Sequence, residues 1–207
     1  MTAFDPAQSP AVKQLVALPI DEVAAAYFET CASDPDRADV AALALREQAR
    51  AGQLDAHAAI LVAAVEVAPN LLCVGHIAKA LGALGRSAQA GAAPLAAQLR
   101  DRPIADDVDY WSFDGAVWAL GYLGGPDARQ ALEELSRETP SRASRSQSVF
   151  QGRMPAVDRE RLFQKALREA GALVAKEDAG TWRARMGQLQ EAPAAKAKGS
   201  QKAWMTR

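Results

Sequence analysis

A seven-residue motif occurs twice in this chain, 39 residues apart. Lys79–Gly85 (KALGALG) recurs as Trp118–Gly124 (WALGYLG), and a second amphipathic segment follows each copy, 92–101 and then 127–138. One helical face carries an alanine and two leucines of each copy, because residues three and four apart lie on the same side of a helix; these are Ala80, Leu81 and Leu84, and Ala119, Leu120 and Leu123. A fixed period of this length is typical of helical hairpins that stack on one another.

Each copy of the motif contains two glycines with different predicted roles. The inner glycine, Gly82 or Gly121, follows a leucine inside the helix and permits close contact with a neighbouring helix, because it has no side chain. The last glycine, Gly85 or Gly124, stands where the apolar pattern stops and is the residue type that most often ends a helix. A single hairpin leaves apolar surface uncovered, so we expect the hairpins to form a stack.

Helix signals dominate the chain, and no window alternates apolar and polar residues as a half-buried strand does. Alanine, the best helix former, supplies much of the 49% of hydrophobic residues. Caps, prolines and glycines set the predicted boundaries. The predicted helices are 23–32, 35–51, 54–67, 71–84, 92–99, 108–123, 127–137, 158–176 and 181–189.

The two motifs and the hairpins around them resemble the HEAT repeat family, specifically the bacterial HEAT-like type shared with phycobilisome-lyase-like repeats. The motif carries the resemblance over 70–139, and architecture alone carries it over 10–69. The resemblance implies an all-α fold, an α-α superhelix (solenoid) of about four to five stacked hairpins. We therefore expect HEAT-like repeats over 1–139, a flexible linker over 140–157, amphipathic helices packing on the array over 158–190, and a disordered basic tail over 191–207.

The net charge of −1 conceals a division along the chain. Residues 1–140 carry 10 Lys+Arg and 19 Asp+Glu, a net of −9, whereas 141–207 carry 14 and 6, a net of +8. The first residues lack the basic and apolar regions of a signal peptide, and the apolar stretches are too short to span a bilayer. We expect a cytoplasmic protein with no membrane partner.

No motif in the sequence predicts catalysis, and we expect neither a cofactor nor a metal. Cys31 and Cys73 lack the CxxC pattern and the further ligands that zinc needs, so we interpret them as small buried residues. His57 and His76 have no HExxH motif and no neighbouring nucleophile pattern. The aspartates between 101 and 114 lack the glycine and glutamate of a calcium loop and are interpreted as helix caps and solvated loop residues.

The segment DDVDYWSFDGAVWALGY carries the first candidate site. Its candidate partner-binding residues are Trp111, Asp114, Trp118 and Tyr122. Trp118 and Tyr122 occupy the places that Lys79 and Ala83 hold in the preceding copy, where a charged residue is acceptable. Large aromatic side chains at a position that tolerates solvent are favoured anchors for a partner. The alternative is that they pack under 139–157 or under the C-terminal helices.

The second candidate site is a basic stripe in the C-terminal region. Its residues are Arg161, Lys165 and Arg168. Three interpretations remain open: a solvated helix face, a surface that docks on the acidic repeats of the same or another copy, or a polyanion-binding site. Phosphate binding requires clustered Lys and Arg rather than a basic protein, so the pI near 6.2 does not exclude it.

These observations predict a non-enzymatic scaffold or adaptor that binds a protein partner along its superhelical surface. The alternatives are nucleic-acid or polyanion binding through the basic C-terminal region, and a HEAT-like enzyme of the DNA glycosylase or bilin lyase type. The repeats that carry the aromatic residues are acidic, which opposes the approach of DNA. The sequence fixes neither the identity of the partner nor the oligomeric state.

Overall fold

The computed structural model describes residues 6–102, 104, 107–143, 156–176 and 180–184, and every regular element in these ranges is a helix. The helices are α1 (Pro10–Val16), α2 (Ile20–Cys31), α3 (Pro35–Arg50), α4 (Ala58–Glu66), α5 (Leu71–Leu84), α6 (Ala92–Asp101), α7 (Asp107–Leu123), α8 (Gly125–Ala143) and α9 (Ala156–Val174). Two 3-10 segments, η1 (Pro6–Gln8) and η2 (Gly85–Gly91), precede α1 and α6. Among the described residues, no helix combines the length and the apolar character that crossing a membrane requires.

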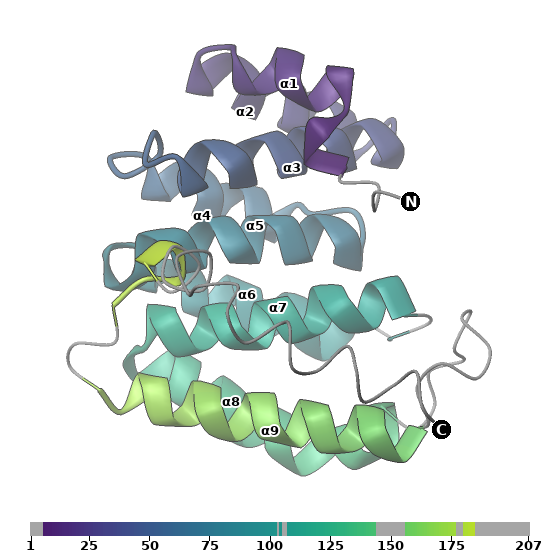
Figure 1. The fold of residues 1–207 in the computed structure, drawn as a ribbon, viewed down its shortest axis with the longest axis vertical. Helices are drawn as coiled ribbons and strands as arrows, with labels where there is room; N and C mark the ends of the chain where they lie inside the picture. The colour runs from purple at the N-terminus through teal and green to yellow at the C-terminus, as the bar shows by residue number, and fades with distance from the viewer. Residues whose placement is uncertain (1–5, 103, 105–106, 144–155, 177–179, 185–207) are drawn as a thin grey trace, which may run out of the picture.

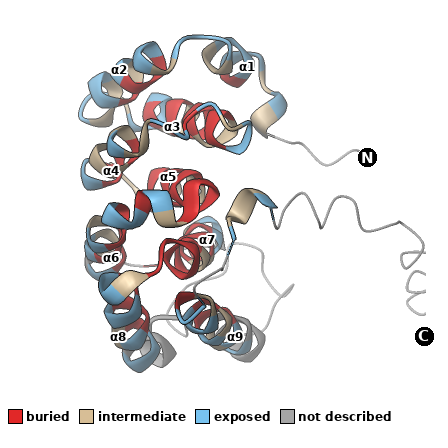
Figure 2. Cartoon of the chain, turned by 90° about the vertical axis from the view of Figure 1, so that its left-hand side faces the viewer, coloured by how far each residue is buried: buried red, intermediate tan, exposed pale blue. Residues whose placement is uncertain are grey.

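The helices lie in two layers that run along the long axis of the molecule (Figure 1). Figure 2 shows α2, α4, α6 and α8 in one layer, here called the even layer, and α3, α5, α7 and α9 in the other, the odd layer. Within each layer every helix packs on the next, and α1 packs on α3 at the N-terminal end. Successive helices along the chain therefore alternate between layers, and one contiguous core of buried side chains fills the space between them.

The helix boundaries follow from side chains and glycines that satisfy the terminal backbone groups. The carboxylate of Asp34 accepts the N–H three residues on at 3.1 Å at the start of α3. The side-chain oxygen of Asn70 does the same at 2.8 Å at the start of α5. The helices α5 and α7 are each followed by a glycine at positive φ, Gly85 at 61° and Gly124 at 64°. The predicted role of these two glycines as helix terminators is confirmed.

Glycines also set the distance between neighbouring odd-layer helices. A Cβ added at Gly82 of α5 would lie 3.3 Å from the Cα of Ala119 in α7. At Gly121, the equivalent position of α7, it would lie 2.9 Å from the Cα of Ala170 in α9. Gly75, two turns before Gly82, meets the α7 backbone at 2.8 Å in the same way. The predicted close helix contact at the inner glycine of each motif is confirmed.

A long-range cap closes the C-terminal end of α9. The guanidinium of Arg86, in the segment η2, lies over Gly124, where an added Cβ would be 0.7 Å from its Nη1. Its Nη2 donates hydrogen bonds to the carbonyls of Leu173 at 3.1 Å, Val174 at 3.3 Å and Lys176 at 2.8 Å. A cation at this place also suits the negative end of the helix dipole. A residue that follows α5 thus terminates α9.

Two other helix ends are capped by side chains from a neighbouring hairpin. Arg102, which follows α6, donates hydrogen bonds to the carbonyls of Ala68 and Pro69 beyond the end of α4. Gln48 of α3 is buried, and its Nε2 donates to the carbonyl of Leu18 at 3.0 Å beyond the end of α1. Buried or half-buried carbonyls are costly without a donor, so these contacts tie successive hairpins together.

The predicted helices 54–67 and 127–137 differ most from the structure, and α1 is not among the predicted helices. The segment 54–57 forms a turn instead of the first turn of a helix, and the His57 N–H donates to the Leu54 carbonyl at 2.9 Å. The side chain of Leu54 is buried although it lies in this turn. An apolar residue at this position is therefore explained by burial and does not indicate a helix. The helix α8 continues to Ala143, into the predicted linker, because a proline near a helix end removes only one donor. Residues 144–155 of that linker, 185–190 and the predicted tail 191–207 lie outside the described residues.

The glycine contacts predict a contrast between two substitutions. Gly121→Ala places a methyl group against the α9 backbone and should lower the free energy of unfolding by about 1–3 kcal/mol, the usual cost of overpacking. Gly171→Ala, on α9 with no atom within 4 Å of its added Cβ, should raise it by up to about 1 kcal/mol through helix propensity. Urea unfolding followed by circular dichroism measures both. Equal effects of the two substitutions would show that backbone contact does not set the odd-layer spacing.

Candidate functional site

A row of charged and polar side chains crosses the odd layer on the face turned away from the even layer. It consists of Arg46 and Glu47 of α3, His76 and Lys79 of α5, and Asp114 of α7, and we call it the polar row. All five side chains are half-buried. Half-buried charges need specific partners, because burial disfavours the charged form of each group.

Arg46 links α3 to α5 within the polar row. Its Nε and Nη2 donate to one carboxylate oxygen of Glu47 at 2.9 Å and 2.6 Å. Its Nη1 lies 3.3 Å from Nδ1 of His76, and a guanidinium only donates, so Nδ1 is the acceptor. Burial, together with the charges of Arg46 and Lys79, lowers the pKa of His76 to about 3. His76 is therefore a neutral acceptor at physiological pH.

Lys79 and Asp114 connect α5 to α7. The Lys79 stem crosses Gly115 of α7, where an added Cβ would lie 2.5 Å from the lysine Cε. Burial raises the pKa of Asp114 to about 6, although the nearby ammonium of Lys79 opposes this shift. Burial, reinforced by Arg46 and opposed by Asp114, lowers the pKa of Lys79. Lys79 forms no hydrogen bond and no ion pair at contact distance with any described residue.

A short C-terminal piece of the chain lies on the same face. Residues 180–184, here called the return segment, contain one helical turn that lies against α5 and α7 on the side opposite the even layer (Figures 1 and 2). The ring of Trp182 meets that of Tyr122 edge to face, with centroids 5.9 Å apart and an interplanar angle of 80°. The Trp182 Cβ also lies 3.5 Å from the Cβ position of Gly82, so this glycine admits the segment as well as α7.

Arg183 fixes the return segment at its polar end. Its two terminal nitrogens donate to the two carboxylate oxygens of Asp55 at 2.7 Å and 3.3 Å, a bidentate pair. The nitrogen at 2.7 Å also donates to the carbonyl of Ala83, near the end of α5, at 3.3 Å. The return segment is thus held by one aromatic contact and one arginine fork.

Together the polar row and the return segment enclose a pocket of about 200 Å³. Its lining residues come from α3, α5 and the return segment: Arg46, Glu47, Arg50, Lys79, Ala83, Trp182 and Arg183. Four of these side chains are cationic and one is a carboxylate. The carboxylate of Glu47 already accepts from Arg46 and lies 3.6 Å from Arg50.

The four predicted partner-binding residues differ in exposure and in the groups that they contact. Trp111 is 52% exposed and packs edge to face on Tyr110, at 5.3 Å between centroids. Trp118 is half-buried against the core, and Asp114 belongs to the polar row. Tyr122 is 2% exposed, so of the two interpretations left open by the sequence, packing under another element holds for it.

The comparison of the two motifs does not support exposure of Tyr122. Ala83, its counterpart in the first motif, is itself buried, and the return segment covers both positions. The position therefore does not tolerate solvent, and the alternative of packing under a C-terminal element holds for Tyr122. Trp111 remains the one strongly exposed aromatic side chain of the four.

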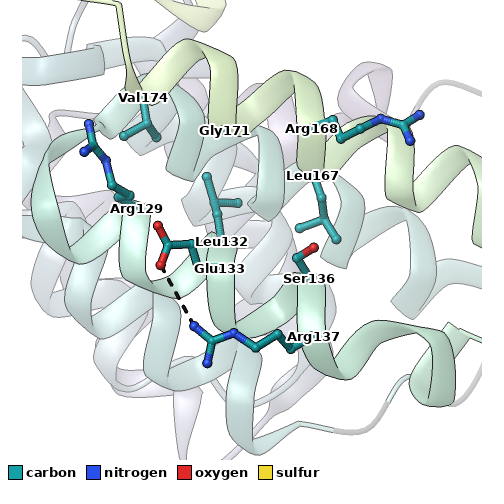
Figure 3. A pocket seen from close by; sticks show the side chains of 9 residues that line it. All are labelled: Arg129, Leu132, Glu133, Ser136, Arg137, Leu167, Arg168, Gly171 and Val174. Atoms are coloured by element: carbon teal, nitrogen blue, oxygen red, sulfur yellow. Dashed lines mark ion pairs between the residues drawn. The ribbon is translucent and has the colours of Figure 1, made fainter.

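The predicted basic stripe lies on α9, at the opposite edge of the stack. Arg161, Lys165 and Arg168 are exposed, and Lys165 lies 3.8 Å from the carboxylate of Glu169. Arg168 borders a groove of about 540 Å³ between α8 and α9. Figure 3 shows two leucines, one from each helix, facing this groove, with Arg168 extending away from the ion pair between Glu133 and Arg137. The stripe and the polar row are separate surfaces.

The cysteines and the tyrosine beside them are structural. Cys73 is buried and donates to the carboxylate of Asp39 at 2.9 Å, and burial raises its pKa far above the usual range. Tyr27 is buried and donates to the carbonyl of Ala64 at 3.0 Å. Cys31 is half-buried and unbridged. Within the described part of the chain, no group of three or more metal-ligating side chains comes together.

No family model, no curated protein and no solved structure matches this chain. The site must therefore be interpreted from its own geometry.

Sequence reasoning missed most of this site. Arg46, Glu47 and His76 carry no motif, and only the three-dimensional stack brings α3, α5 and α7 side by side. Trp182 stands in the predicted helix 181–189, which we expect to pack on the array, but no pattern in the sequence indicates the face on which it packs. A signal was available in Gly82 and Gly121, because small residues on the face of a repeat indicate that something packs there.

The polar row predicts acid sensitivity. The folded pKa of His76 lies below the unfolded value of 6.5, so only the unfolded chain takes up a proton as the pH falls. This group should lower the free energy of unfolding below pH 6.5, by up to about 1.4 kcal/mol per pH unit. His76→Gln keeps an acceptor for Arg46 and should lose this part of the dependence in urea unfolding between pH 7 and 4.5. An unchanged slope would contradict the prediction.

Asp114 should show the opposite sign. Its folded pKa of about 6 lies above the unfolded value of 3.8, so its contribution to stability is present at low pH and is lost as the pH rises through 6. Asp114→Asn should therefore stabilise the protein more at pH 7 than at pH 4.5, relative to wild type, in the same unfolding measurement. A stabilisation that is equal at the two pH values would place the titrating group elsewhere.

Proposed function

We propose that this chain is a HEAT-like helical repeat protein, a solenoid of stacked hairpins that serves as a non-enzymatic scaffold or adaptor. Its partner binds as a peptide segment on the outer face of the odd layer, across α5 and α7. The site comprises Tyr122, Asp55 and the Ala83 carbonyl, next to the polar row.

Support for the repeat architecture comes from the equivalence of the two motifs in space. Each copy forms the end of an odd-layer helix, α5 or α7, and is followed by a glycine at positive φ. The inner glycine of each copy meets the backbone of the next odd-layer helix. Equivalent sequence positions thus make equivalent contacts one hairpin apart, which is the defining property of a repeat stack.

The single observation that carries the binding proposal is the return segment. A five-residue piece of this chain, distant in sequence from α5 and α7, lies on the face through one aromatic contact and one bidentate ion pair. These two kinds of contact are frequent at protein interfaces, where aromatic and arginine side chains are the favoured anchors. The face is therefore able to hold an extended peptide that presents a tryptophan followed by an arginine.

The return segment is held weakly enough to be exchanged. The Asp55 side chain is 59% exposed, and ion pairs in such surroundings contribute at most about 1 kcal/mol. Trp182 itself is half-buried rather than enclosed. A partner segment with the same two anchors and further contacts would displace it.

The polyanion alternative has less support. Its residues lie on α9, where Arg168 borders a groove that also carries Glu133, and Lys165 is close to the carboxylate of Glu169. A phosphate backbone is bound by clustered free cations, and carboxylates among them weaken that binding.

A labelled peptide with the sequence of residues 177–190 tests the proposal directly. Full-length protein with Trp182→Ala and Arg183→Ala, the open variant, should bind this peptide in a fluorescence anisotropy titration. Wild type should bind it at least about tenfold more weakly, because its own segment competes at a high effective concentration. Adding Asp55→Asn to the open variant should weaken the peptide by roughly fivefold, the equivalent of about 1 kcal/mol.

The matched control is Glu133→Gln in the open variant, because this carboxylate is also exposed and ion-paired but lies on α8. It should leave peptide affinity unchanged. Equal affinity for wild type and the open variant, or no effect of Asp55→Asn, would refute the proposed face. Proteins that the open variant captures from native lysate and that the peptide releases are then the partners, whereas nucleic acid released by salt alone would favour the basic stripe.

A further inference from the structure

The pocket between the return segment and the helices α3 and α5 is lined mainly by cationic side chains, which the binding of a peptide does not explain. Its four cations come from three elements: Arg46 and Arg50 from α3, Lys79 from α5, and Arg183 from the return segment. Glu47 is the only carboxylate in the lining, and both of its oxygens face arginines. The lining thus carries an excess of positive charge in a partly enclosed space.

Lys79 is the group whose surroundings are incomplete. It is half-buried, and no described residue accepts a hydrogen bond from its ammonium or forms an ion pair with it. Arg46, by contrast, is engaged with Glu47 and His76. A half-buried ammonium without an acceptor loses hydration without compensation, so an acceptor in the pocket would stabilise it.

Neither of the two other carboxylates near the pocket, Asp55 and Asp114, supplies an acceptor at contact distance for Lys79. Asp55 holds Arg183 from the solvent side at 2.7 Å, and Asp114 approaches Lys79 from α7 without lining the pocket. Asp114 raises the pKa of Lys79 through its charge but forms neither a hydrogen bond nor an ion pair at contact distance with it. Neutral His76, in turn, offers no positive charge and only fixes Arg46.

We propose that this pocket binds one small oxyanion, a phosphoryl or carboxylate group, between Lys79, Arg50 and Arg183. A volume of about 200 Å³ corresponds to roughly six water molecules at about 30 Å³ each, which is room for a tetrahedral oxyanion and a few waters. Guanidinium groups present paired donors to such anions, and a lysine adds a point charge. The site exists in the closed chain and does not depend on a partner.

The anion also has a structural consequence for the return segment. Arg183 and Trp182 form one wall of the pocket, whereas Arg50 and Lys79 belong to the helices of the stack. An anion between them would bridge the segment to α3 and α5 and would tighten its hold on the face. Binding of the anion and closure of the segment are therefore coupled in the same direction.

The test is calorimetric titration of full-length wild-type protein with inorganic phosphate and, separately, with succinate, in chloride buffers of equal ionic strength. We expect one saturable site for phosphate, succinate or both, and the better ligand identifies whether the natural group is a phosphoryl or a carboxylate. Lys79→Met should abolish this binding. Arg50→Gln should weaken it by roughly fivefold, because its partly exposed guanidinium supplies one charge-assisted hydrogen bond.

Arg37→Gln is the matched control, because Arg37 is another exposed arginine of α3 that lies outside the pocket and pairs only with Asp34. It should bind the anion as wild type does. Circular dichroism of each variant establishes that it is folded. If Lys79→Met does not fold, the effect of Arg50→Gln on anion binding still decides the test. The proposal would be overturned if titration with phosphate and with succinate released no more heat than titration with chloride. It would also be overturned if Arg37→Gln and Arg50→Gln weakened anion binding equally.

Discussion

Close contact between helix backbones in the odd layer is the constraint on which the rest of the molecule depends. Gly75 and Gly82 bring α5 against α7, and Gly121 brings α7 against α9. At such a short separation no bulky side chain fits between the helices, so large residues must lie between the layers or on the outer face. Lys79 of α5 thereby interacts with charged groups of both neighbouring helices, Arg46 of α3 and Asp114 of α7.

The outer face of the odd layer combines two kinds of recognition in a small area. Tyr122 and Asp55 contact the return segment through Trp182 and Arg183. Lys79 and Arg50 line the pocket next to this segment, where we propose that they bind an anion. Arg183 belongs both to the peptide contact and to the proposed anion pocket, so both kinds of binding act on the return segment. If both proposals hold, the concentration of a small anion would regulate how readily a partner gains access to the scaffold.

Local sequence patterns were sufficient for most of the helices and for the glycine contacts, because caps, periodicity and glycines act within a few residues, but they did not predict α1 or the ends of α4 and α8. The span 71–84 and the glycine contacts of α5 and α7 were predicted in this way. The candidate site was mostly beyond prediction, because it depends on contacts such as that between Asp55 and Arg183, which are 128 residues apart. The sequence left the exposure of Tyr122 open for the same reason, since no residue near it in the sequence indicates contact with the ring of Trp182.

The cap that Arg86 places on α9 limits how this protein can change its length. Repeat stacks commonly grow or shrink by whole hairpins, because each unit contacts only its neighbours. Here Arg86 precedes α6, and its guanidinium lies over Gly124 and reaches the carbonyls at the end of α9, so that α6, α7 and α8 intervene in the chain. Inserting or deleting a hairpin between these points would leave that helix end without its donor. Hairpins added on the N-terminal side of Arg86 would leave this cap intact, whereas the cap constrains the length of the stack that follows Arg86.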